Sequence, residues 1–206
     1  MPHVTAIDFY FDPACPWTWI TSRWLSEVAP RRDLDVTWRT FSLMVRNRDR
    51  VASGEWAAIA ASQFRSLRVI EAARSAHGDG AVGPLYTQLG ARVHHDGDVM
   101  LAGLAEAIEA AGLPPDLVSA ADDESWDAAI VASTEAGWKL VGDDVGIPII
   151  VVAGNASTFF GPVMSPAPTG DAAVALWDAY SALGRFDGVF EIKRSRSVGP
   201  QFAARP

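Results

Sequence analysis

The chain has 206 residues, of which 49% are hydrophobic and one is cysteine, and it carries a net charge of −8. That length fits one globular unit or a core with an inserted subdomain, and the negative charge disfavours binding to nucleic acid or to anionic membranes. No apolar run approaches the roughly 20 residues that cross a bilayer. The first residues lack the features of a signal peptide, and one cysteine cannot form an internal disulfide, so we expect a cytoplasmic protein.

The chain opens with a pattern that predicts a strand, a helix and a second strand. Residues Val4–Phe11 alternate in polarity, and Asp12-Pro13 ends that strand. A helix is predicted from Cys15 or Pro16 to about Val28, since its apolar residues recur at helical spacing. Residues Leu34–Leu43 predict the next strand. This opening is a βαβ unit.

A block of helices follows, and strand character then returns. We predict helices over residues 56–77, 82–95, 99–111 and 125–140, separated by glycine- and proline-containing breaks. Residues 148–152 and 157–161 predict a hairpin, residues 171–183 a helix, and residues 190–196 a partly extended basic tail. The expected fold is α/β: a thioredoxin-like core formed by residues 1–45 and 141–206, interrupted by an all-helical insertion at residues 46–140.

The lone cysteine lies where the first strand gives way to the first helix. A cysteine at a helix start faces unpaired backbone N–H groups and the positive end of the helix dipole, which favour the reactive thiolate. Thr18, three residues on, could donate a further hydrogen bond to the sulfur, whereas a charged Asp12 would oppose the thiolate. The alternative is that Cys15 is a small buried hydrophobe. We expect a reactive thiol.

A proline marks the start of the later hairpin. A proline opening an inner strand requires the strand's first position or a special peptide geometry, so we expect a cis bond between Ile147 and Pro148. In thioredoxin-like folds, such a proline packs against the redox cysteine. The preceding residue, here Ile147, offers its backbone to an incoming thiol or peptide.

These features make the chain resemble the DsbA-like branch of the thioredoxin superfamily, and within it the mycothiol-dependent nitroreductases of actinobacteria. The resemblance implies a thioredoxin-like fold, a cytoplasmic location, mycothiol as thiol donor and reduction of nitro-aromatic or quinone-like compounds. It is carried by residues 11–24, Ser42-Leu43, Asn47, Ala76-His77-Gly78, Pro84-Leu85-Tyr86, residues 142–148, residues 159–163 and residues 190–196.

One position departs from that family's usual Cys-Pro-Trp-Cys motif. Thr18 stands where the second cysteine is expected. A site with one thiol can still form a mixed disulfide that an external thiol releases. We therefore predict an enzyme, a monothiol oxidoreductase that uses mycothiol or another low-molecular-weight thiol and reduces electrophilic or nitro-aromatic compounds. The predicted catalytic residues are Cys15, Thr18 and Pro148, and those that bind thiol or substrate are Pro16, Trp17, Asn47, Trp56 and Ile147.

Two alternatives remain open. The chain also resembles kappa-class glutathione transferases and 2-hydroxychromene-2-carboxylate isomerases, which place a serine at the position of Cys15 and activate a bound thiol. The second alternative is a binding protein without catalysis. No metal site is expected, because the adjacent His94 and His95 point about 100° apart on a helix and lack further ligands at suitable spacing. Apolar faces of the helical insertion could support a homodimer.

Overall fold

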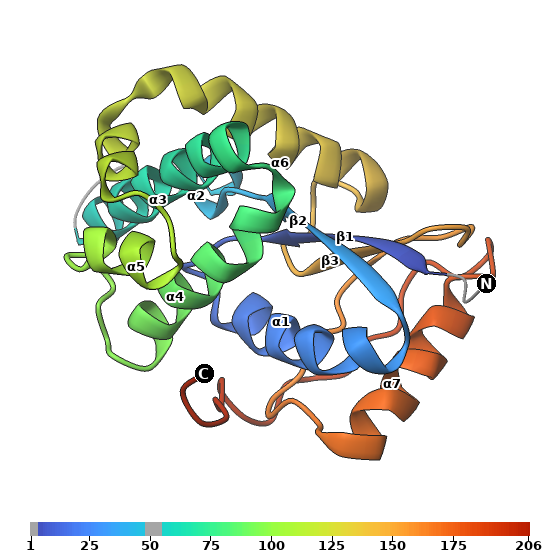
Figure 1. Cartoon of the computed structure of the whole chain (residues 1–206). Coiled ribbons are helices and arrows are strands. Elements are labelled where there is room, and N and C mark those ends of the chain that lie inside the picture. The colour runs from blue at the N-terminus through green and yellow to red at the C-terminus, as the bar shows by residue number, and fades with distance from the viewer. Residues whose placement is uncertain (1–3, 48–54) are drawn as a thin grey trace.

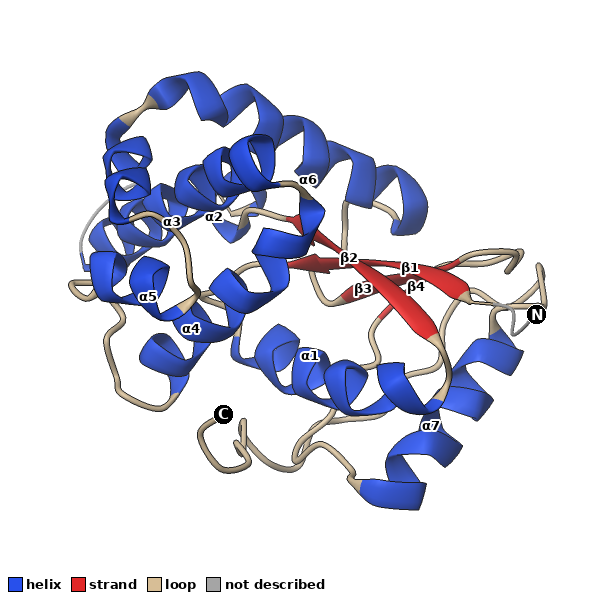
Figure 2. Cartoon of the chain, viewed as in Figure 1, coloured by secondary structure: helices blue, strands red, loops and turns tan. Residues whose placement is uncertain are grey.

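The strand β1 (Thr5–Phe11) lies inside a four-stranded sheet whose order is β2-β1-β3-β4. The computed structural model describes residues 4–47 and 55–206. β2 (Leu34–Thr40) pairs with β1 in parallel, while β3 (Ile149–Val152) pairs with its other side antiparallel, and β4 (Phe159–Phe160) pairs antiparallel with β3. Figures 1 and 2 show these strands as the layer between two groups of helices.

Helices cover both faces of this sheet. α1 (Pro16–Val28) packs beside α7 (Gly170–Leu183) on one face, and α6 (Asp127–Val141) contacts β2 and β4 from the other. None of the described helices is long and apolar enough to cross a membrane. The other helices are α2 (Leu43–Arg46), α3 (Glu55–His77), α4 (Val82–His94) and α5 (Leu104–Ala110), with short 3₁₀ turns at Ala29–Arg31, Asp79–Ala81, Pro115–Asp122 and Glu124–Trp126.

The predicted elements occur in the predicted order, but α2 was not predicted and several element ends differ. The strand predicted at residues 157–161 covers only Phe159–Phe160, and the helix predicted from residue 125 begins at Asp127. The second strand ends at Thr40 rather than Leu43, because Ser42 caps α2 by accepting a hydrogen bond from the Val45 N–H at 3.1 Å. The helix predicted from residue 99 begins at Leu104, because the Asp98 carboxylate accepts bonds from two backbone N–H groups in the preceding turn. The division into a core and an insertion at residues 46–140 stays a prediction.

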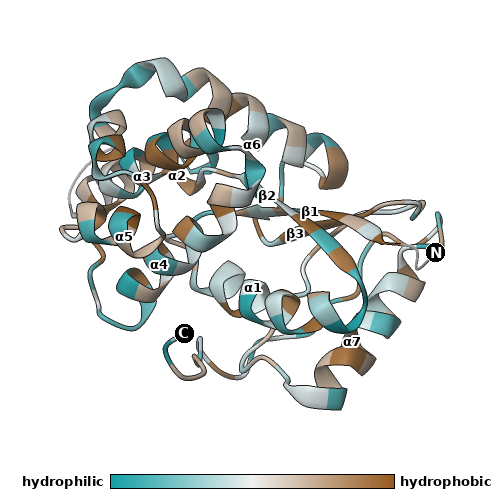
Figure 3. Cartoon of the chain, viewed as in Figure 1, coloured by the Kyte–Doolittle hydropathy of each residue, from teal (hydrophilic) through white to brown (hydrophobic). Residues whose placement is uncertain are grey.

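The core combines β-branched and aromatic side chains of the strands with aliphatic and aromatic side chains of the helices. β3 consists of four apolar β-branched residues and is brown throughout in Figure 3, as expected for a strand with helices on both sides. Trp19 on α1 is fully buried, stacks on His94 and donates a hydrogen bond from Nε1 to His95 Nε2 at 3.1 Å. α1 is thereby packed against α4.

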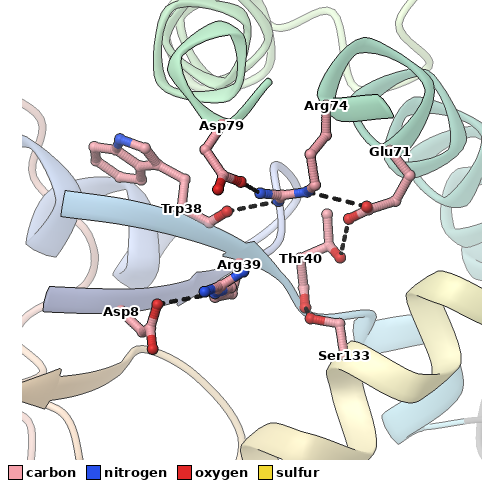
Figure 4. A network of polar contacts seen from close by, with 8 residues as sticks. All are labelled: Asp8, Trp38, Arg39, Thr40, Glu71, Arg74, Asp79 and Ser133. Atoms are coloured by element: carbon pink, nitrogen blue, oxygen red, sulfur yellow. Dashed lines mark hydrogen bonds and ion pairs between the residues drawn. The ribbon is translucent and has the colours of Figure 1, made fainter. Parts of the chain in front are cut away.

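A polar network fastens α3 to the strand β2 (Figure 4). The buried Glu71 carboxylate accepts a hydrogen bond from the Thr40 hydroxyl at 2.6 Å and pairs with Arg74 at 3.1 Å. Arg74 donates to the Trp38 carbonyl at 2.6 Å and also pairs with Asp79. Each charge in this network has a partner, so α3 is held firmly against β2.

Candidate active site around Cys15

Cys15 is the residue that caps the N-terminus of α1. Its backbone is extended, with φ −84° and ψ 109°, and Pro16 occupies the first turn of the helix. The Cys15 N–H donates to the Asp12 carbonyl at 3.0 Å, and the Cys15 carbonyl accepts from Trp19 at 3.0 Å. Proline fits this position because its missing N–H would have no partner there. The thiol therefore lies at the positive end of the helix.

The thiol is covered by apolar side chains from four parts of the chain. Cys15 is 5% exposed and lies in a cluster with Tyr10, Phe41, Ile147 and Ile149. Trp17, Leu43 and Trp138 pack against the same cluster. We refer to the five buried residues, Cys15 included, as the Cys15 cluster. In this arrangement a reagent reaches the sulfur only after some of these side chains move.

Burial changes the acidity of the Cys15 thiol in the direction opposite to the one expected. Loss of solvent raises the pKa of Cys15, and this effect exceeds the lowering from the Thr18 hydroxyl and from the N–H groups of Thr18 and Trp17. The nearby Asp12 raises it further. The expectation of a thiolate stabilised at the helix start was wrong for this conformation, because desolvation of a charge outweighs a helix dipole.

Asp12 is buried at the start of residues 12–15, the turn between β1 and α1 that we call the cysteine loop. It is 2% exposed, and its carboxylate accepts hydrogen bonds from the Ala14 N–H at 2.9 Å and the Leu43 N–H at 2.7 Å. Burial raises the pKa of Asp12 to about 6, although both hydrogen bonds oppose the rise. The carboxyl group therefore joins the cysteine loop to α2 and titrates close to neutral pH.

Thr18 occupies the position where a second cysteine would stand. The residue is fully buried, and Oγ1 has no hydrogen-bond partner among the described residues. Its hydroxyl favours the thiolate form of Cys15 even though it makes no full hydrogen bond to the neutral thiol. A buried hydroxyl without a partner costs about 1–3 kcal/mol, so this group is available to a sulfur or oxygen atom that arrives at the site.

The loop before β3 supplies the other side of the site. The Ile147–Pro148 peptide bond is cis, and the Pro148 carbonyl accepts a hydrogen bond from the Gly161 N–H at 2.7 Å. Ile147 belongs to the Cys15 cluster. No described residue forms a hydrogen bond with the Ile147 N–H or carbonyl, so both groups are free to pair with a ligand backbone.

The remaining predicted binding residues lie in different surroundings. Pro16 and Trp17 form the first turn of α1 beside the thiol. Asn47 ends α2, and its Nδ2 donates to the Leu43 carbonyl at 2.9 Å, so this amide group caps its own helix. The side chain of Trp56 lies outside the described residues.

Two residues near the site were not predicted. Trp138 on α6 packs against the Cys15 cluster, and its buried Nε1 has no hydrogen-bond partner among the described residues. His94 Nε2 donates to the Pro13 carbonyl at 2.8 Å and so supports the cysteine loop from α4. Burial lowers the pKa of His94 to about 4. The only signal for either residue would have been its place on a predicted helix.

Packing of the Cys15 cluster leaves the cysteine only slightly exposed. A hollow of about 430 Å³ lies at the other end of the sheet and is bordered by Arg32, Trp177 and Asp178. Within the described part of the chain, no three His, Cys, Asp or Glu side chains gather as a metal site would require.

Comparison with known proteins identifies the family. The family model for the mycothiol-dependent nitroreductase Rv2466c matches residues 14–194. The chain belongs to this Rv2466c-like family. This result confirms the resemblance found in the sequence and makes the chain a thiol-dependent oxidoreductase. A relative, the uncharacterized protein Rv2286c of Mycobacterium tuberculosis, is 26% identical over 204 residues, which cover 94% of this chain and 84% of the relative.

Solved structures agree with this family in their fold. The probable DsbA oxidoreductase SCO1869 from Streptomyces coelicolor is 19% identical, with a TM-score of 0.56 over 98% of this chain and 99% of that one. The cytosolic disulfide reductase DsbM from Pseudomonas aeruginosa is 16% identical, with a TM-score of 0.56 over 86% and 99%. A 2-hydroxychromene-2-carboxylate isomerase is 16% identical, with a TM-score of 0.57 over 87% and 95%. The DsbA-like thioredoxin fold predicted from the sequence is confirmed.

Proposed function

We propose that this member of the Rv2466c-like family is a monothiol oxidoreductase in which Cys15 forms mixed disulfides with a low-molecular-weight thiol, mycothiol first among them. The observation that carries the proposal is Thr18, a fully buried residue whose hydroxyl has no described partner and which favours the Cys15 thiolate. With one cysteine in the chain, no internal dithiol can supply two electrons by closing to a disulfide. The family description supports mycothiol as the co-substrate.

The exchange proceeds in two balanced steps. The Cys15 thiolate attacks one sulfur of a disulfide RS–SR, an S–S bond to Cys15 forms, and RS⁻ leaves. An external thiolate R′S⁻ then attacks the sulfur of the bound RS group, which releases Cys15 as thiolate and forms the mixed disulfide RS–SR′. Reduction of a nitro group to a nitroso group would consume two external thiols, yielding one disulfide and one water. The Thr18 hydroxyl and the free Ile147 backbone are the polar groups available to an incoming thiol.

The buried state of Cys15 adds a requirement for reaction. Because the thiol is covered and its pKa is raised, docking must displace a side chain of the Cys15 cluster before the thiolate forms. A reducing compartment such as the cytoplasm would supply the thiol, and likeness to a cytosolic disulfide reductase supports that location. The homodimer stays a prediction.

Intact-mass measurement tests the proposal. The protein is incubated with oxidised mycothiol and, in a parallel sample, with oxidised glutathione, and Cys15→Ser serves as the control. We expect a mixed disulfide with mycothiol that Cys15→Ser does not form and that added mycothiol removes. No adduct with either disulfide would refute the proposal.

A second function is favoured by the same buried thiol. A sulfur with a raised pKa is poorly suited to attack, but it could position a bound thiol co-substrate, as a serine does in the isomerase-like enzymes. Likeness to the 2-hydroxychromene-2-carboxylate isomerase concerns the fold alone. Activity with a thiol co-substrate that survives Cys15→Ser would favour this function over disulfide exchange.

A further inference from the structure

The C-terminal tail of the chain is fixed on both sides of Arg196. Before it, the Phe186 carbonyl accepts a hydrogen bond from the Ser157 hydroxyl at 3.0 Å. After it, Ser165 Oγ donates to the Gly199 carbonyl at 2.8 Å and accepts from the Gln201 N–H at 2.8 Å.

Two further contacts hold the end of the tail on α4. The centroid of the Phe202 ring lies 5.4 Å from that of the His94 ring and 5.5 Å from that of the His95 ring. Arg205 pairs with the Asp96 carboxylate through two hydrogen bonds of 3.0 and 2.9 Å. Arg196 therefore lies in a segment that is anchored at residue 186 before it and at residues 199–205 after it.

Arg196 rests on the indole ring of Trp17. Its guanidinium carbon lies 4.9 Å from the ring centroid. The side chain is exposed and forms no ion pair or hydrogen bond with a described residue, whereas Arg32, Arg68 and Arg205 each grip a carboxylate with two nitrogens. A guanidinium that lies over an aromatic ring keeps its in-plane N–H groups free, and these fit a carboxylate through two parallel bonds.

Trp17 lies between the Arg196 guanidinium and the residues around the Cys15 thiol. It stands two residues after Cys15, and its ring packs against the Cys15 cluster. The chain as a whole carries a charge of −8, so its general field repels anions, and a cation beside the site would offset that repulsion locally. Lys193 and Arg194 lie in the same exposed stretch and add positive charge.

We propose that Arg196, held over Trp17, is a specificity-determining residue that binds a carboxylate on the disulfide or electrophile attacked by Cys15. This inference rests on the proposed function and narrows its substrate class to planar or thiol-derived compounds that carry a carboxylate near the reacting atom. Mycothiol carries no carboxylate, so its own binding does not depend on Arg196. The aromatic face of Trp17 suits a planar compound, and the N–H groups of Arg196 suit its carboxylate.

Two aromatic disulfides that differ in charge test the proposal. Dithiobis(nitrobenzoate) carries a carboxylate on each ring, whereas dithiodipyridine is uncharged near neutral pH, and each releases a coloured thiol when Cys15 attacks it. We expect Arg196→Gln to slow reaction with the dianionic disulfide about three- to fivefold, the upper part of the range for one exposed charge pair, and to leave the uncharged disulfide within about twofold. Oxidised glutathione is the third substrate, because its carboxylates belong to a low-molecular-weight thiol and not to an aromatic ring. Slowing with it by Arg196→Gln would mean that Arg196 also binds the carboxylate of a thiol.

Arg194→Gln is the matched control, because it removes the same charge from the same stretch without a contact to Trp17. Equal slowing by Arg194→Gln and Arg196→Gln would overturn the proposal in favour of a general field. Parallel slowing with both aromatic disulfides would also overturn it, since a packing role of Arg196 would not distinguish charge. If wild-type Cys15 reacts with none of the three disulfides, the proposed function itself fails. If all three disulfides react and both variants match the wild-type rates, only the role of Arg196 is overturned.

Discussion

Asp12 at the end of β1 accepts a hydrogen bond of 2.7 Å from the backbone N–H of Leu43, so one buried carboxylate holds together the cysteine loop and the start of α2. Leu43 itself packs against the Cys15 cluster. The charge of Asp12 therefore acts on the structure of the site and on the acidity of its thiol at once.

Asp12→Asn should change how stability depends on pH. Burial raises the pKa of Asp12 from 3.8 to about 6, so its contribution to stability is fully present below the lower value and is lost as pH rises through the higher one. The loss amounts to at most about 3 kcal/mol. Urea unfolding should show wild type losing this much relative to Asp12→Asn between about pH 4 and about pH 7. A stability difference that does not vary with pH would contradict the assignment.

His94 should contribute with the opposite sign. Burial lowers the pKa of His94 from 6.5 to about 4, so its contribution is present above the higher value and is lost as pH falls through the lower one. Titration of the ring by NMR should place its midpoint well below that of an exposed histidine. His94→Gln should weaken the acid sensitivity of unfolding and keep a donor for the Pro13 carbonyl. A midpoint near the ordinary value would show that the ring is not buried in solution.

Thr18→Cys should restore a dithiol site. The new thiol would stand three residues after Cys15 on the same helix start, and oxidation should lower the mass of the protein by its two thiol hydrogens. Thr18→Val keeps the shape but removes the hydroxyl that favours the thiolate, so alkylation by iodoacetamide should need a higher pH than in wild type. Thr18→Ser, which keeps the hydroxyl, is the control. Equal alkylation profiles for Val and Ser would rule out a role for the hydroxyl.

Gly90→Ala should destabilise the contact between α4 and α1. A β-carbon at Gly90 would overlap the ring of the fully buried Trp19, whose environment leaves no room to shift. Overpacking of this kind costs about 1–3 kcal/mol. Gly80→Ala is the matched control, since nothing lies within 4 Å of a β-carbon there. Thermal unfolding of both variants checks the difference, and equal midpoints would mean that the two helices separate easily.

Local pattern was enough to predict most elements, because periodicity and proline positions act within a few residues. The first strand, α1 and α7 follow their patterns closely. The pattern predicts a second strand that continues past Thr40, because Phe41 and Leu43 prolong its apolar run, while the cap at Ser42 depends on a hydrogen bond that the pattern does not reveal. The acidity of Cys15 was missed for a similar reason: the helix start is local, but its cover includes Trp138, which lies on a helix far along the chain.

The network of Glu71 and Arg74 has a consequence for the order in which the chain opens. Separation of α3 from β2 would leave the buried Glu71 carboxylate without Thr40 and the Arg74 guanidinium without the Trp38 carbonyl. Loss of the partner of a buried charge costs about 3–5 kcal/mol. The helices between β2 and β3 and the sheet should therefore melt as one cooperative unit. Native-state hydrogen exchange would then give amides in α3 the same opening free energy as amides in β1, and a lower value in α3 would reveal a separately unfolding part.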